Sequence, residues 1–95
     1  MSDTRQILIP PHVKATRVEG DYVLMDMKSG KYLGLDPVAS TVWESLAEHG
    51  DLDRAAHDVC QSFEVELERA RADVEAWVEE MVGKGVLARA GTGRA

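Results

Sequence analysis

The period of the hydrophobic residues changes once along this 95-residue chain, at Asp36, and that change limits the folds open to it. Before Asp36 the apolar residues follow a period of two, which is typical of strands. After it they recur every three to four residues, as they do in helices. Strands that all precede the helices indicate an α+β domain, and a chain of this length has room for one hydrophobic core.

Three short strands are expected in the first part of the chain. They cover residues 13–18, 22–27 and 31–35. Polar turns at Gly20 and Gly30 separate them, and turns this tight favour an antiparallel meander. Residues 1–12 form an N-terminal arm in this interpretation. Its one apolar run, residues 7–9, would add to a sheet edge or lie across the core.

Three helices are expected in the second part. The first begins at Asp36-Pro37, an N-cap followed by proline at the first helical position, and ends at Gly50. The second begins at Asp51, and the third runs from about Val65 to Lys84. The apolar face of the first helix would hold Val38, Val42, Trp43 and Leu46. That of the third would hold Leu67, Ala70, Val74, Trp77, Val78 and Met81.

The predicted fold is therefore α+β and winged-helix-like, a three-stranded antiparallel sheet followed by three helices. Three short strands cannot form a stable sheet alone, so the helices must cover one face. We place the domain at residues 13–87, with Val86-Leu87 returning to the core. Residues 88–95 are expected to form a flexible C-terminal tail.

Charge and composition exclude several classes of function. The formal net charge is −6, and residues 36–95 hold six basic and thirteen acidic residues. An acidic third helix would repel phosphates, which argues against nucleic-acid binding. The apolar runs are far shorter than the about 20 residues of a membrane span, and the N-terminus does not resemble a signal peptide. We therefore expect a cytoplasmic protein with neither a nucleic-acid nor a membrane partner.

Residues able to carry catalysis or bind a metal do not form a convincing set. Cys60 and His57 lie three residues apart on the second helix, but Cys60 falls on its apolar face, where a cysteine usually serves as a small hydrophobe. His49 and His57 lack the spacing of a zinc motif. We expect no catalytic residue, no metal and no cofactor.

The third strand offers a different chemistry, because it ends directly in a capped helix and one of its edges can remain unpaired. An unpaired edge can accept a strand from another chain. Gly34 lacks a side chain where a second backbone could approach. Residues 7–9 or a second copy of the protein could instead cover this edge.

The residues from Asp26 to Leu46 resemble the PqqD family, and in particular its stand-alone members from lasso-peptide pathways. The matching pattern is Gly30-x-Tyr32-x-x-Leu35-Asp36, followed by a helix with Val42-Trp43 and Leu46. The second half agrees at Phe63-x-Val65, Ala70-x-x-Asp73-Val74, Val78-x-x-Met81 and Gly85-Val86-Leu87. The likeness spans about residues 13–87.

This resemblance implies a recognition element for ribosomally made, modified peptides. In that family the leader segment of a precursor peptide adds as an antiparallel strand beside the third strand, in a groove closed by the third helix. The protein performs no chemistry and presents the precursor to a leader peptidase, a transglutaminase-like cysteine protease, and then to a macrolactam cyclase. Lasso leaders of this kind typically carry Tyr-x-x-Pro-x-Leu.

Transferred to this chain, the resemblance implies ten peptide-binding residues. Those on the third strand are Lys31, Tyr32, Leu33, Gly34 and Leu35, and those on the third helix are Ala70, Asp73, Val74, Trp77 and Met81. For Tyr32, filling of the core and contact with the ligand are both open. Val74, Trp77 and Met81 lie on the apolar stripe, so each is also a candidate for a purely structural role.

Two alternatives remain beside a lasso-peptide adaptor. One is a peptide chaperone for another pathway, such as pyrroloquinoline quinone formation with a radical enzyme. The other is an acidic winged-helix regulator that acts through protein contacts. We also hypothesise that the acidic helical half binds basic residues of a leader or enzyme, in which case high salt would weaken binding.

Overall fold

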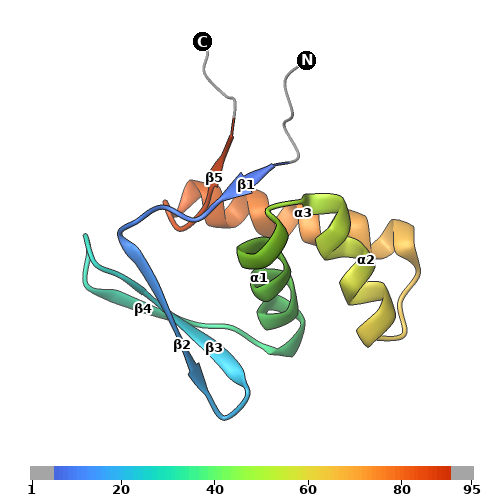
Figure 1. Ribbon diagram of the computed structural model, residues 1–95, viewed down its shortest axis with the longest axis horizontal. Coiled ribbons are helices and arrows are strands. Elements are labelled where there is room, and N and C mark those ends of the chain that lie inside the picture. Colours follow the sequence, from blue (N-terminus) through green and yellow to red (C-terminus); the bar gives the residue numbers. More distant parts are fainter. Residues whose placement is uncertain (1–5, 91–95) are drawn as a thin grey trace.

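The three predicted strands form one antiparallel sheet in the computed structural model, which describes residues 6–90. They are β2 (Val13–Val18), β3 (Asp21–Asp26) and β4 (Lys31–Gly34), each within one residue of its expected bounds. The strand order is β2-β3-β4, so β3 is central and β4 lies at an edge (Figure 1). The predicted α+β, winged-helix-like fold is confirmed.

Three helices follow the sheet. They are α1 (Pro37–His49), α2 (Leu52–Ser62) and α3 (Leu67–Gly83). Asp36 caps α1 by accepting the Ala39 N–H at 2.8 Å, and Asp51 caps α2 by accepting the Asp53 N–H at 2.9 Å. Glu66 makes no side-chain cap, and α3 begins at Leu67 rather than at Val65.

Two short strands outside the main sheet bring the ends of the domain together. In this ribbon β1 (Ile7–Leu8) pairs antiparallel with β5 (Ala88–Arg89) (Figure 1). The apolar run of the arm therefore covers no edge of the main sheet, and Ile7 is buried in the core. Pairing at residues 88–89 extends the fold past the boundary expected at Leu87. Residues 1–5 and 91–95 of the arm and tail lie outside the described residues.

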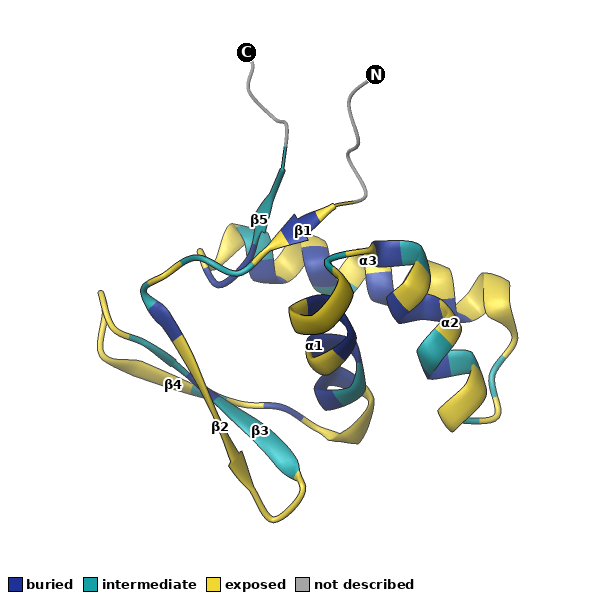
Figure 2. Cartoon of the chain, viewed as in Figure 1, coloured by how far each residue is buried: buried dark blue, intermediate teal, exposed yellow. Residues whose placement is uncertain are grey.

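The core lies where the three helices meet one another and the inner face of the sheet (Figure 2). Its largest fully buried side chains are Ile7, Leu24, Val42, Leu52, Val74, Val78 and Leu87. Two residues expected on apolar helix faces are instead exposed, Val38 at 40% and Leu67 at 38%. Both occupy the first turn of their helix. No helix within residues 6–90 has the length and apolar content to cross a membrane.

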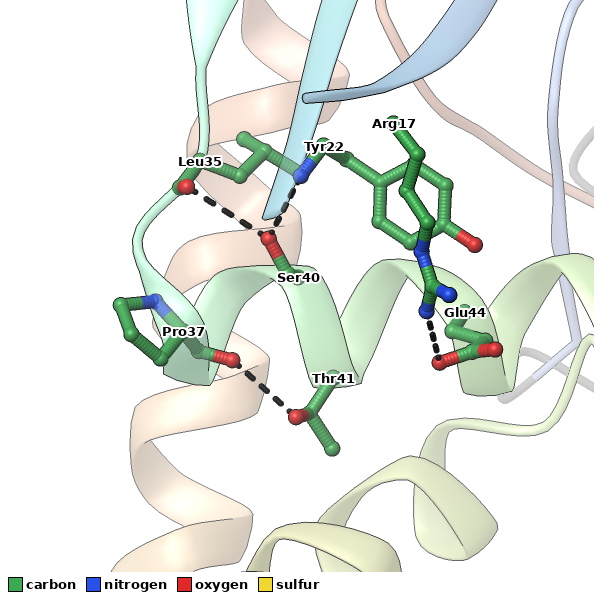
Figure 3. A network of polar contacts seen from close by, with 7 residues as sticks. All are labelled: Arg17, Tyr22, Leu35, Pro37, Ser40, Thr41 and Glu44. Carbon is green, nitrogen blue, oxygen red and sulfur yellow. Dashed lines mark hydrogen bonds and ion pairs between the residues drawn. The ribbon is translucent and has the colours of Figure 1, made fainter. Parts of the chain in front are cut away.

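A small polar network joins the sheet to α1 (Figure 3). The Ser40 hydroxyl, on a buried residue of α1, accepts the backbone N–H of Tyr22 at 3.0 Å and donates to the Leu35 carbonyl at 3.4 Å. The Arg17 guanidinium on β2 pairs with the Glu44 carboxylate on α1 at 3.2 Å. The same guanidinium lies 5.0 Å from the centre of the Tyr22 ring. These contacts set the position of the sheet relative to the helices.

Candidate functional site

The outer edge of β4 is open in the part of the chain that the structure describes. β4 pairs with β3 on one side, and β1 pairs with β5 instead of covering the other. The expectation that the third strand leaves an edge unpaired agrees with this topology. An open edge of this kind presents backbone N–H and C=O groups that another strand can pair with.

The hydrogen bonding at the end of β4 shows which residues turn their backbone toward the open edge. The Leu35 N–H donates to the Tyr22 carbonyl at 2.9 Å, so the backbone of Leu35 faces β3. In an antiparallel pair this direction alternates from one residue to the next. Leu33 therefore also faces β3, whereas Tyr32 and Gly34 offer their N–H and C=O groups to the open edge.

The side chains of β4 alternate between the two faces of the sheet. Leu33 pairs in register with Leu24, which is 1% exposed, and both lie on the face of the sheet that is turned toward the helices. Tyr32 pairs with Met25 on the outer face and is 62% exposed. Of the two roles left open for Tyr32, filling of the core is therefore excluded.

A largely apolar cavity of about 310 Å³ lies where β4 leads into α1, and we call it the α1–α3 pocket. Its lining consists of Asp36, Val38, Ala39, Val42, Val59, Phe63, Val65, Ala70, Asp73, Val74 and Trp77. Side chains of all three helices converge here, and half-buried Trp77 offers the largest of them. Such a cavity suits an apolar side chain of a ligand.

A second cavity, of about 350 Å³, lies beside the beginning of β4, and we call it the β3–β4 pocket. Its lining consists of Leu24, Asp26, Ser29, Lys31, Tyr32, Leu33, Lys84 and Val86. The Lys28 N–H donates to Asp26 Oδ1 at 2.9 Å, and this hydrogen bond lowers the pKa of the Asp26 carboxyl below its ordinary value. Asp26 is therefore ionised at neutral pH.

The two pockets lie at opposite ends of β4, and we call the surface that runs from one to the other along the open edge the groove. Residues near the start of β4 share the β3–β4 pocket with Lys84, which follows α3, while Asp36 shares the α1–α3 pocket with the first half of α3. β4 and α3 thus run in opposite directions along the groove. The groove brings together a strand edge, one helix and two cavities.

The five helix residues implied by the family resemblance differ in position. Ala70, Val74 and Met81 are buried at 1%, 2% and 3% exposure, and Met81 lines neither pocket. Asp73 is exposed and Trp77 is half-buried, and both line the α1–α3 pocket. Access from the groove is thus greatest at Asp73 and Trp77.

Sequence reasoning did not assign a binding role to four residues that line the pockets. Phe63 and Val65, at the end of α2 and just after it, line the α1–α3 pocket, and Lys84 and Val86 line the β3–β4 pocket. The family pattern includes Phe63 and Val65, but a sequence pattern does not show which of its apolar residues border a cavity.

The residues considered for catalysis or metal binding lie on α2 and at the end of α1. The Cys60 thiol donates to the Val65 carbonyl at 3.0 Å, and His57 is exposed. No hydrogen bond joins these two side chains within residues 6–90. In the same range, no three His, Cys, Asp or Glu residues are grouped so that they could hold a metal ion.

Comparison with known proteins gives one family and two similar structures. The family described as coenzyme PQQ synthesis protein D (PqqD) matches residues 21–87. TbiB1 in complex with the TbiA(beta) leader peptide has a TM-score of 0.80 at 22% identity, covering 92% of this chain and 99% of that one. A lasso peptide synthetase B1 complexed with the leader peptide has a TM-score of 0.79 at 23% identity, covering 87% and 98%. No curated protein matches the chain.

Proposed function

The chain belongs to the PqqD family, and we propose that it is a non-catalytic adaptor that binds the leader of a ribosomally made precursor peptide. The leader would add as an antiparallel strand to the open edge of β4, beside α3. The observation that carries this proposal is the open edge itself, because it borders a groove with a cavity at each end.

Backbone pairing would supply sequence-tolerant affinity. Tyr32 and Gly34 each direct one donor and one acceptor toward the open edge, so a peptide strand can pair with both residues. A Cβ built at Gly34 meets no heavy atom within 4 Å, so the packing of the fold does not itself require glycine at this position.

Side-chain contacts would supply selectivity. In an added strand, every second side chain points toward the helices, where the α1–α3 pocket can take an apolar one. In a leader that carries Tyr-x-x-Pro-x-Leu, the Pro and the Leu are two positions apart and can both face the helices. We assign Trp77 and Asp73 as contacts on α3, and Ala70, Val74 and Met81 as the buried residues that support them.

Lasso-peptide biosynthesis is the pathway we favour. Both similar structures are named as complexes with a leader peptide, and one of them is a lasso peptide synthetase B1. We propose by analogy that this chain presents its precursor to a leader peptidase of the transglutaminase-like cysteine protease type, and then to a macrolactam cyclase.

The family description favours one second candidate, a peptide chaperone for a radical enzyme such as the one in pyrroloquinoline quinone formation. The groove would bind a peptide in the same way in both pathways. Genes encoded beside this one distinguish them, because a short precursor gene with a protease and a cyclase belongs to the lasso pathway.

The proposal is tested by fluorescence-polarisation titration with the leader segment of the precursor encoded nearby, using the core segment of the same precursor as the control. Saturable binding of the leader alone supports the adaptor function. If the folded protein binds no leader, both by itself and with the peptidase added, the proposal is wrong.

A further inference from the structure

The two ends of the groove between β4 and α3 carry opposite charge. In the α1–α3 pocket, the ionisable lining residues are Asp36 and Asp73. The Asp36 carboxylate accepts the Ala39 N–H at 2.8 Å and makes no ion pair within residues 6–90. Asp73 lies 3.4 Å from Arg69, but both side chains are mostly exposed, at 62% and 73%, and such pairs are weak. This end of the groove is therefore acidic.

The β3–β4 pocket has a basic character instead. Lys31 and Lys84 line it together with Asp26. The Asp26 carboxylate already accepts the Lys28 N–H at 2.9 Å and lies 3.9 Å from His12 Nε2. Lys84 has a long, exposed contact with Glu80 at 3.8 Å, and Lys31 makes no ion pair in the part of the chain that the structure describes. Both ammonium groups thus remain available to a ligand.

The direction of β4 relates these charges to the two ends of a bound peptide. β4 runs from Lys31, in the basic pocket, toward Asp36, in the acidic one. An antiparallel peptide enters at the Asp36 end and leaves at the Lys31 end. We infer, on the basis of the proposed function, that the groove selects peptides with basic residues before the added strand and acidic residues after it.

This charge pattern would also fix the orientation of the peptide. Parallel pairing is only slightly less stable per residue than antiparallel pairing, so the backbone alone discriminates weakly. A peptide bound in the parallel direction would place its basic residues beside Lys31 and Lys84. Since exposed charge pairs contribute little individually, we expect the preference to be about threefold to tenfold in Kd from both ends together.

Two peptides of identical composition test this inference. Each is acetylated, amidated and contains Tyr-x-x-Pro-x-Leu with alanine at x. One has Lys-Lys before this element and Glu-Glu after it, and the other has the two flanks exchanged. We expect the first to bind about threefold to tenfold more tightly at low salt, and the ratio to approach one in 1 M salt, where charges are screened within about 3 Å.

Substitutions on and near α3 locate the effect. Asp73→Lys and Lys84→Glu should each reduce the ratio of the two Kd values, whereas Glu75→Lys should leave it unchanged. Glu75 is an exposed residue of the same helix that lines neither pocket, so it is a matched control for the change of charge.

Equal binding of the two peptides, or tighter binding of the exchanged one, would overturn the charge preference and leave the proposed function standing. Binding of neither peptide to a folded protein that does bind the leader encoded nearby would overturn the charge preference alone, whereas failure to bind that leader as well would overturn both. The charge preference would also be contradicted if Glu75→Lys and Asp73→Lys reduced the ratio of the two Kd values equally. The net charge of the protein, and not the groove, would then determine which peptide binds more tightly.

Discussion

The backbone N–H of Tyr22 donates to the Ser40 hydroxyl at 3.0 Å. In an uninterrupted antiparallel pair this N–H would instead donate to the Leu35 carbonyl. The Leu35 N–H still donates to the Tyr22 carbonyl at 2.9 Å. The Ser40 side chain is thus inserted into the last step of the β3–β4 ladder (Figure 3). One residue of α1 thereby determines where β4 leaves the sheet, and with it the geometry of the groove.

Ser40→Ala should lower the free energy of unfolding by about 1–3 kcal/mol, because the substitution leaves the Tyr22 N–H without its partner at a part-buried position. Urea denaturation measures this loss. Thr41→Ala is the matched control, since the Thr41 hydroxyl donates only to Pro37 in its own helix, at 3.0 Å. It should change stability by less than about 0.5 kcal/mol. Equal losses in the two variants would contradict a special role for Ser40.

Trp77→Ala should weaken leader binding at least roughly tenfold, because large aromatic residues in a binding pocket commonly dominate affinity. Trp77 lines the α1–α3 pocket, whereas Leu67 lies on the same helix, is 38% exposed and lines neither pocket. Leu67→Ala should therefore bind the leader as the parent does. Titration of both variants, after circular dichroism has shown that they are folded, checks this. If Trp77→Ala bound the leader with unchanged affinity, the α1–α3 pocket would not be part of the binding site.

Acid should destabilise the protein partly through Asp26. The hydrogen bond from the Lys28 N–H, helped by Ser29 and His12 and opposed by desolvation, lowers the pKa of this carboxyl in the folded state. A lowered pKa stabilises the fold above the pKa of the unfolded chain, and this stabilisation is lost as the pH falls through the folded value. Asp26→Asn should therefore lose less stability than the parent as the pH falls below 3.8, the ordinary pKa of this carboxyl.

Urea denaturation at several pH values measures this difference. Glu75→Gln is the control for the loss of one exposed carboxylate. If Asp26→Asn and the parent lose the same stability on acidification, Asp26 does not contribute as described.

The elements could be predicted from the sequence because their signals are local. Asp36-Pro37 and Asp51 marked the starts of α1 and α2, and both aspartates cap their helices in the structure. The start of α3 was placed two residues too early, because Glu66 makes no side-chain cap there. The pairing of β1 with β5 could not be predicted, since two-residue strands about 80 positions apart leave no periodic pattern.

The groove could be predicted only in outline. The end of the third strand in a capped helix indicated an open edge, and the family resemblance indicated its use. Which side of the sheet Tyr32 occupies depends on its register with Met25, and that register follows from the turn before β4. The two cavities and their charges depend on how the three helices pack and on where the segment after α3 lies, which no local pattern encodes.

Strand addition to β4 is the central claim, and leader binding by Gly34→Pro and Gly34→Ala tests it most directly. Proline removes an N–H that faces the open edge and makes no bond to β3, so the fold should survive while the added strand loses a donor. Alanine keeps that N–H, and its Cβ meets no heavy atom within 4 Å. We predict that folded Gly34→Pro fails to bind the leader while Gly34→Ala binds it as the parent does. Parent-like binding by folded Gly34→Pro would contradict strand addition.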